Sequence, residues 1–275
     1  MPDKPVPDNP APGVLADQLV LTEVADGVAT ITLNDPGRRN SVTAAMSLAV
    51  EAACQEIAAN RAARVVVLTG AGPVFSAGGD LASLTSQASG QGSPLGDLYR
   101  GFEALSALNV PTLAAVNGPA VGAGMNWALA CDVIIAGESA RFDPRFLDVG
   151  IHPGGGHLWR LLTRAGRQAA AALVLFGEAL TGAEAVTHGL AWKCVPDSEL
   201  PAAARAMALR VAGRSPELVR RTKATLGASA PITNAREASD LEQVVQEWSI
   251  AQPAFKEGVA ALQRRLAERG AAAAK

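Results

Sequence analysis

The chain has 275 residues, of which 49% are hydrophobic and 18% are charged, so it can bury one large core or two small ones. A formal net charge of -2 argues against a nucleic-acid-binding or membrane-surface protein, and no apolar run is long enough to span a membrane. Three widely separated cysteines show neither metal-binding spacing nor a disulfide framework, which favours a reducing, cytoplasmic setting: Cys54, Cys131 and Cys194.

In the first third of the chain, the sequence pattern predicts a leader, a hairpin, a helix and a strand. Residues 1–16 are rich in proline and lack an apolar signal core, which predicts a disordered leader. Residues 19–33 alternate as two strands around Asp26-Gly27. Ser41 or Thr43 can cap a helix that runs to about Asn60. Residues 64–70 then form an apolar run typical of a buried strand, and the loop 71–80 follows.

In the middle of the chain, the sequence pattern predicts further strands that alternate with helices, and towards the end it predicts helices. Residues 81–94 are rich in Ser, Gly and Gln and predict a mobile segment, followed by a helix over about 95–107. Residues 111–124 predict a strand, a glycine-rich turn and a helix start, and 130–142 predict a strand and a short extended piece. A second turn, PGGG at 153–156, precedes another helix, and a short strand is expected near 190–195. We therefore expect an α/β core over 17–200 and a helical region over 201–275.

Two glycine-rich turns can expose backbone N–H groups. Gly78 and Gly79 in FSAGGDL allow the chain to approach a ligand closely. Gly122, Ala123 and Gly124 open a helix, whose first amides have no partner within the helix. Two amides that converge on one point would stabilise a developing oxyanion, each by roughly 3–4 kcal/mol. Either turn alone is better explained as a tight turn.

The order of these segments carries a resemblance to a known family. Five segments follow one another in a fixed order. They are a strand with FSAGGDL, a strand with NGPAVGAG that leads into a helix, the pair CD, the stretch RF-x-x-x-x-LDVGIHPGGG and, near the end, FKEGVAALQRRL. This order resembles the crotonase family, the enoyl-CoA hydratase/isomerase superfamily, over about residues 19–267. The resemblance implies a spiral of ββα units with a helical C-terminal trimerisation region, assembled as trimers or dimers of trimers. It implies an acyl-CoA thioester as substrate and no metal or redox cofactor.

The resemblance also implies roles for single residues. The amides of Gly79 and Ala123 would be the two oxyanion donors. Lys256 is the candidate for the 3′-phosphate of coenzyme A, with Arg38 or Arg39 as the alternative, although each cation could equally be a solvated surface charge. The other positions expected to bind coenzyme A or the acyl group are Ala77, Gly78, Asp80, Leu81, Gly122 and Phe146.

The chain departs from the family pattern where hydratases carry two glutamates. The first matched position is Asn126 and the second is Phe146. These glutamates position water and exchange a proton, whereas an amide can only position water and a phenyl ring can do neither. The missing pair weakens the expectation of a hydratase more than it weakens the resemblance to the family.

Polar residues close to the second position are candidates for a relocated acid or base. Asp148 and His152 are the foremost, with Asp143 and His157 nearby. Each could instead have a structural role: Asp143 in a turn before a proline, Asp148 in a pair with an arginine such as Arg145, and His157 facing outward from a helix start. Structural roles suffice for the remaining candidates, His188, Trp127 and Glu184.

Three hypotheses remain open at this point. The first is an enzyme of hydratase, isomerase or hydrolase type that moves a proton at the α-carbon with a relocated acid or base. The second is a binding protein that has kept the acyl-CoA site and lost the chemistry, with Phe146 packed against the acyl chain. The third is slow hydration in which Asn126 and a chain of waters replace the glutamates.

Overall fold

The computed structural model describes residues 19–90 and 92–273, so the predicted leader lies outside the described residues. Contacts divide the chain into two compact units, with the division after Gly213. The first unit contains both glycine-rich turns, and the second is helical.

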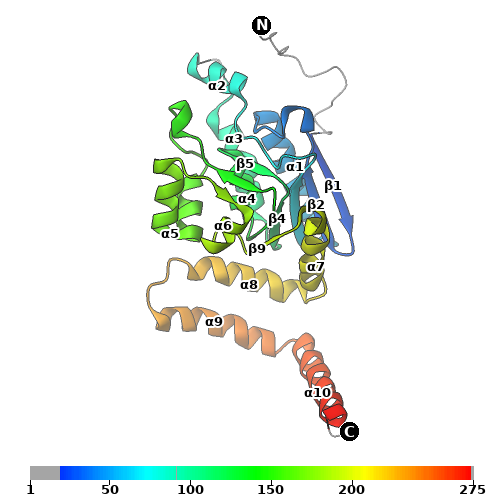
Figure 1. Cartoon of the computed structure of the whole chain (residues 1–275). Helices are drawn as coiled ribbons and strands as arrows, with labels where there is room; N and C mark the ends of the chain where they lie inside the picture. The colour runs from blue at the N-terminus through cyan, green and yellow to red at the C-terminus, as the bar shows by residue number, and fades with distance from the viewer. Residues whose placement is uncertain (1–18, 91, 274–275) are drawn as a thin grey trace. The chain divides into compact units, whose positions relative to one another are not determined.

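The larger sheet of the first unit contains six strands in the order β1-β2-β3-β4-β6-β9. Figure 1 labels β1, β2, β4 and β9 of this sheet. The antiparallel pair β1 (Val20–Ala25) and β2 (Val28–Leu33) turns at Asp26 and Gly27, both with positive φ, which confirms the predicted hairpin. The strands from β2 onward are parallel: β3 (Val65–Gly70), β4 (Thr112–Val116), β6 (Val133–Gly137) and β9 (Lys193–Val195). Parallel strands buried on both faces read as continuous apolar runs, as β3 does.

Helices cover both faces of this sheet. On one side α1 (Ala44–Ala59) and α3 (Leu95–Ala107) pack together and contribute to the main core. Of the two predicted caps, Thr43 is the one used, and its hydroxyl accepts a hydrogen bond from the Met46 amide at 3.1 Å. On the other side α7 (Leu200–Ala212) buries three apolar residues against strand residues that include Val28 and Val65. The boundary predicted after residue 200 falls at the start of this helix.

A smaller sheet joins β5 (Pro119–Val121), β7 (Arg141–Asp143) and β8 (Leu180–Thr181). The short helix α4 (Gly124–Ala130) follows β5, and a 3-10 turn, η3 (Leu147–Val149), follows β7. Next come α5 (His157–Phe176), which is kinked at Gly166, and α6 (Gly182–Thr187). Two further 3-10 turns are η2 (Pro36–Arg38) and η4 (Asp197–Glu199).

One segment differs from the expectation. Where we predicted a mobile stretch over 81–94, the structure forms the helix α2 (Leu81–Ala88). The Leu84 and Ser89 amides donate helical hydrogen bonds to the carbonyls of Asp80 and Thr85. Leu84 also packs beneath the first glycine-rich turn, since a methyl group added at Gly79 would lie 3.6 Å from its Cδ1 atom. The helix is therefore accompanied by a hydrophobic contact that the Ser, Gly and Gln content of the segment does not reveal.

The second unit contains α8 (Pro216–Ser229), α9 (Ala235–Ile250) and α10 (Pro253–Ala273). α8 and α9 pack against each other, with the Arg221 guanidinium 4.2 Å from the centroid of the Trp248 ring. Both of these helices are described throughout, and neither buries a residue. Several of their large apolar side chains are therefore exposed, among them Leu226 and Val244.

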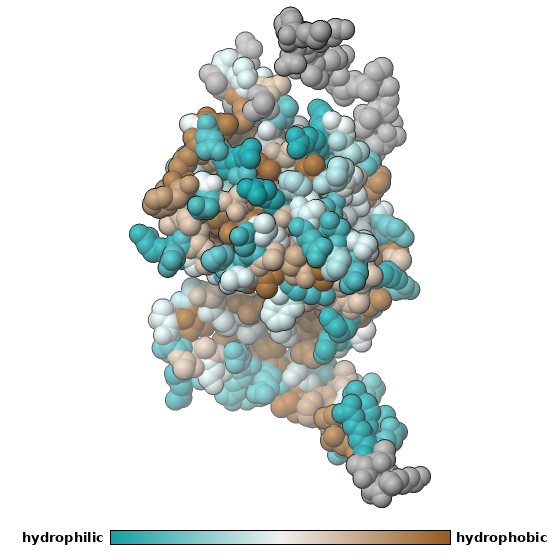
Figure 2. Space-filling model, viewed as in Figure 1, coloured by the Kyte–Doolittle hydropathy of each residue, from teal (hydrophilic) through white to brown (hydrophobic). Residues whose placement is uncertain are grey.

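The surface of the first unit mixes hydrophilic and hydrophobic residues over the face shown in Figure 2. Among the described residues, no helix has both the length and the apolar character needed to cross a membrane. Within the same residues, no group of His, Cys, Asp and Glu side chains is arranged to hold a metal ion.

Candidate functional site

The structure brings the two glycine-rich turns into direct contact. Ser76 pairs with Ala120 in a parallel β-bridge, and the Val121 amide donates to the Ser76 carbonyl at 2.9 Å. Gly78 has φ +91°, and a methyl group at its Cα would lie 2.6 Å from the Val121 carbonyl oxygen and 3.7 Å from the Ala123 nitrogen. A side chain cannot be accommodated there without movement of the backbone. Gly78 thus allows the close approach that its sequence context predicted.

The loop before α1 holds the first turn from its other side. The Val42 amide donates to the Gly78 carbonyl at 2.7 Å, and the Ala77 amide donates to the Arg39 carbonyl at 2.9 Å. Asn40 is fully buried, and its Nδ2 donates to the carbonyls of Val74 and Ala71 at 2.8 and 2.9 Å. Sequence reasoning missed this scaffold role of Asn40. An asparagine in a polar loop gives no sign of burial before the loop is placed against another.

The two amides expected to bind an oxyanion are not used by the backbone. Within the described part of the chain, neither the Gly79 nor the Ala123 amide donates a backbone hydrogen bond. Ala123 precedes α4 with φ -60° and ψ -23°, so its N–H belongs to the unpaired start of the helix. The neighbouring Gly122 amide is occupied, because it donates to the Asp143 carbonyl at 2.7 Å. The two turns therefore bring free donors to the same junction.

Most of the residues expected to contact coenzyme A belong to the first unit. Ala77 and Asp80 are half-buried beside the first turn, and the side chain of Leu81 lies outside the described residues. Arg38 is exposed and pairs with Asp35, with Nε 2.7 Å from Oδ2. Lys256 is exposed on α10 in the second unit.

The two residues that the resemblance matches to glutamates, Asn126 and Phe146, both contact one histidine. Asn126 is 1% exposed on α4, and its Oδ1 lies 2.9 Å from the Nδ1 of His157. Its Nδ2 donates to the Gly154 carbonyl at 3.0 Å. The Phe146 ring packs edge-on against the His157 ring, with 4.8 Å between centroids. An amide, a phenyl ring and an imidazole thus form one contact cluster.

The outward orientation that we considered for His157 is wrong, because the residue is only 1% exposed. Gly155 and Gly156 both have positive φ, and α5 begins directly after this turn with His157 as its first residue. Burial lowers the pKa of His157 from 6.5 to about 4, and the charge of Arg160 contributes in the same direction. Its imidazole is therefore neutral at pH 7. A polar residue at the start of a helix that follows PGGG was the only signal in the sequence.

The two foremost acid/base candidates are on the surface. Asp148 is exposed on η3, and His152 is exposed with its Nδ1 2.7 Å from the Pro153 carbonyl oxygen. The ion pair that we considered between Asp148 and Arg145 is also wrong. The Nε of Arg145 instead lies 2.6 Å from the Oδ2 of the buried Asp143. Asp143 stands before Pro144 as expected, and its carboxylate is held by this ion pair.

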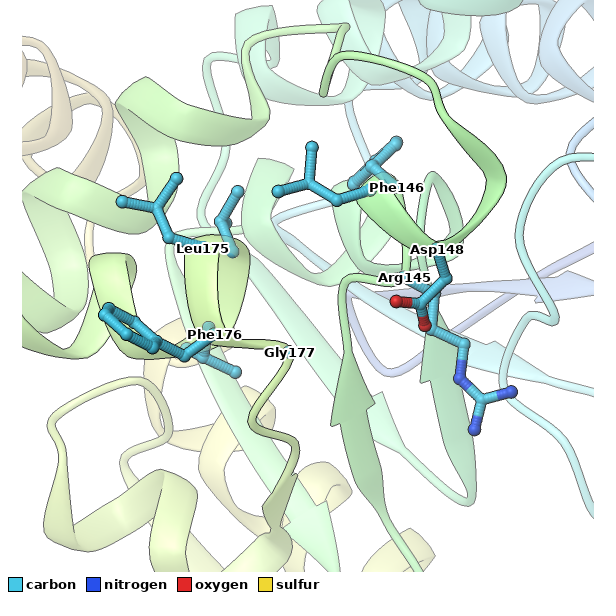
Figure 3. Close-up of a pocket in the computed structure, with 9 residues that line it drawn as sticks. Arg145, Phe146, Asp148, Leu175, Phe176 and Gly177 are labelled. Carbon is cyan, nitrogen blue, oxygen red and sulfur yellow. The ribbon is translucent and has the colours of Figure 1, made fainter.

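A hollow of about 150 Å³ lies beside these residues. Its walls are residues 145–148 on one side and residues 173–177, at the end of α5, on the other. Figure 3 shows Phe146 and Asp148 on the first wall and Leu175 and Phe176 on the second. We call it the α5 hollow; it combines apolar walls with one carboxylate and one guanidinium at its edge.

Comparison with known proteins places these features in a family context. A family model described as enoyl-CoA hydratase/isomerase matches residues 23–269. A probable enoyl-CoA hydratase of Mycobacterium tuberculosis is 44% identical over 252 residues, covering 90% of this chain and 98% of that protein. The 1,2-epoxyphenylacetyl-CoA isomerase of Escherichia coli is 32% identical over 249 residues, covering 89% and 95%. The crystal structure of an enoyl-CoA hydratase from Bacillus anthracis superposes with a TM-score of 0.83 at 29% identity, covering 90% of this chain and 97% of that one.

Proposed function

The chain belongs to the enoyl-CoA hydratase/isomerase family, the crotonase superfamily, and from this premise we propose that it moves a proton at the α-carbon of an acyl-CoA thioester. The thioester oxygen would become an enolate oxygen that accepts hydrogen bonds from the Gly79 and Ala123 amides. The observation that carries the proposal is the junction of the two turns, where both amides are unused by the backbone and only a glycine fits at position 78.

The reaction does not use the two-glutamate mechanism of hydration. Asn126 replaces one carboxylate, and its amide oxygen and nitrogen are already bonded to His157 and Gly154. A water-positioning role for Asn126 has little support, because that role needs a side chain whose polar atoms face the substrate. Asp148 and His152, which the sequence offered as acid/base candidates, stand on the segment that follows Phe146, and both side chains are exposed.

Isomerisation is the reaction class that we favour. Shifting a double bond needs one group that takes a proton from one carbon and returns it to another, whereas hydration also needs a group that activates water. Loss of both carboxylates affects hydration more severely for this reason. One relative is an isomerase of a coenzyme A thioester, which is compatible with this choice.

A non-catalytic acyl-CoA-binding protein is the second candidate. The observation that favours it is that Asn126 and Phe146 occupy the two matched glutamate positions, so neither position has a carboxylate. Both side chains are buried. In that case Phe146, on the wall of the α5 hollow, would contact the acyl chain.

Coenzyme A contacts and assembly are further parts of the proposal. We assign the 3′-phosphate of coenzyme A to Lys256, or to Arg38 or Arg39. We assign the adenine and the pantetheine to the backbone around Arg38, Ala77, Gly79 and Asp80. A homotrimer or a dimer of trimers is supported by the large apolar side chains that the second unit exposes, including Leu226, Val244 and Leu266. Sedimentation of the full chain would test the assembly. The cytoplasmic location stays a prediction.

The function is tested with short and long acyl-CoA thioesters on one protein sample. We expect tight binding, conversion of 3-enoyl-CoA to the conjugated 2-enoyl-CoA, and exchange of α-protons with deuterated solvent. Hydration of trans-2-enoyl-CoA should be slow by comparison. Binding without exchange or conversion would support the carrier, and fast hydration would contradict the isomerase assignment.

A further inference from the structure

We propose that His157, rather than Asp148 or His152, is the group that takes and returns the substrate proton, through its Nε2 atom. The inference rests on the proposed function, because it needs a thioester enolate at the two turns. Three observations support it: a hydrogen bond that selects the tautomer, a buried nitrogen without a partner, and packing against both glutamate positions.

The hydrogen bonds of Asn126 determine which nitrogen of His157 carries the proton. The Gly154 carbonyl can only accept, so the Nδ2 of Asn126 must face it, as it does at 3.0 Å. The Oδ1 of Asn126 must then face His157, and it can only accept from Nδ1. The neutral ring is therefore the Nδ1–H tautomer, and Nε2 carries the lone pair.

The Nε2 lone pair is unused in the described part of the chain. The atom is buried and has no hydrogen-bond partner among these residues. A buried acceptor without a partner costs free energy, and such an atom is more readily explained when it has a ligand to meet. The His157 ring contacts Phe146 and bonds Asn126, so it lies against both positions where hydratases of the family keep their acid/base groups.

The basicity of this nitrogen suits the role. A pKa of about 4 is close to that of an ordinary glutamate, so the neutral imidazole attracts a proton about as strongly as the carboxylate that it would replace. Unlike a carboxylate it has no charge before the reaction, which makes it compatible with its apolar neighbour Phe146. Arg160, whose charge opposes protonation, has its guanidinium held by the Gly155 carbonyl and the Ser106 hydroxyl.

His157 alone can take and return the proton in the proposed step. The bond between the α-carbon and its proton breaks, the proton binds Nε2, and the electron pair passes through the carbonyl carbon to the thioester oxygen. The resulting imidazolium keeps its Nδ1–H bond to Asn126, and the enolate oxygen is held by the Gly79 and Ala123 amides. Return of the proton to the γ-carbon of a 3-enoyl thioester completes an isomerisation. Isotope exchange occurs when the proton on Nε2 is first replaced by a deuteron from the solvent, which is then delivered to the α-carbon.

Three matched variants test the assignment, because the chain has three histidines. We would measure α-proton exchange into butanoyl-CoA and decanoyl-CoA in deuterated water for His157→Gln, His152→Gln and His188→Gln. His157→Gln should lower the exchange rate by about 100-fold or more while the dissociation constant for the thioester changes little. The other two variants should keep the wild-type rate. An unaffected His157→Gln variant, or a comparable loss in His152→Gln, would overturn the proposal.

A measurement on the unaltered protein covers the case in which His157→Gln does not fold. With ¹⁵N-labelled histidine, the Nε2 resonance of His157 should have the position of an unprotonated nitrogen and should move when the acyl-CoA binds. The His188 resonance should not move. A His157 resonance that is insensitive to bound acyl-CoA would overturn the role. Wild-type protein that binds thioester without any exchange would instead remove the proposed function itself.

Discussion

The junction of the glycine-rich turns and the cluster of Asn126, Phe146 and His157, which we call the His157 cluster, are built from different chemical groups. The junction uses backbone amides and a glycine, so its geometry depends on how strands and turns are placed. The His157 cluster uses three side chains, each of which one substitution can replace. Under the proposed function, the fold sets the binding of an enolate, whereas these few side chains set the choice of reaction.

The largest expected effect comes from removing the backbone amide of Ala123 at the junction. Ala123→Pro deletes the proposed donor, and its φ of -60° is one that proline adopts. We expect the α-proton exchange rate to fall by about 100- to 1,000-fold, the scale for one oxyanion donor. Ala123→Gly, which keeps the amide, is the control and should stay close to wild type. Equal rates in both variants would show that this amide does not contact the substrate.

The second prediction concerns how the His157 cluster makes the stability of the fold depend on pH. The pKa of His157 is about 4 in the folded protein against 6.5 as the reference, so between these values the unfolded chain binds a proton that the folded chain does not. Stability should therefore fall as the pH drops from about 6.5 to about 4, by on the order of 3 kcal/mol from this group. Urea unfolding at several pH values should show this loss in wild type and a smaller one in His157→Gln. Parallel losses in the two proteins would mean that His157 titrates normally.

The third prediction compares Gly78 at the junction with Gly150, which ends the η3 turn. Gly78→Ala meets both a positive φ and the Val121 carbonyl oxygen, whereas Gly150→Ala meets a positive φ of 71° with no atom within 4 Å. Gly78→Ala should be the more destabilising by about 1–3 kcal/mol, the usual range for overpacking. Thermal or urea unfolding measures the difference. If Gly150→Ala is equally harmful, the close approach of the two turns is not what requires a glycine.

The smallest expected effect tests the bond between Asn126 and His157. Asn126→Asp keeps the shape but places a carboxylate beside the Nδ1–H group, which stabilises the charged imidazolium. The pKa of His157 should rise from about 4 to about 5 or higher, as followed by NMR titration of its ring protons. The same titration of His188 provides the control. An unchanged value for His157 would mean that the two side chains are not in contact.

Periodicity and turn chemistry determined most of the elements of the first unit. The hairpin at Asp26-Gly27, the helix capped by Thr43 and the buried strand over 65–70 all follow from local rules, and the structure confirms them. The crotonase-like architecture implied by the order of motifs is confirmed as well. The stretch over 81–88 was misjudged, because Ser and Gln content does not reveal that Leu84 packs under Gly79.

The sequence by itself indicated that two turns could present free amides, and that Asn126 and Phe146, which the resemblance matches to glutamates, carry no carboxylate. Only the tertiary structure decided which polar group lies beside those positions, since Asn126 and His157 are 31 residues apart in the chain. A histidine's environment depends on which segments fold over it, and no local pattern records that His157 is buried while His152 is exposed. A tight turn can be predicted from the sequence because glycine alone adopts its backbone conformation freely, whereas the environment of a side chain exists only after folding.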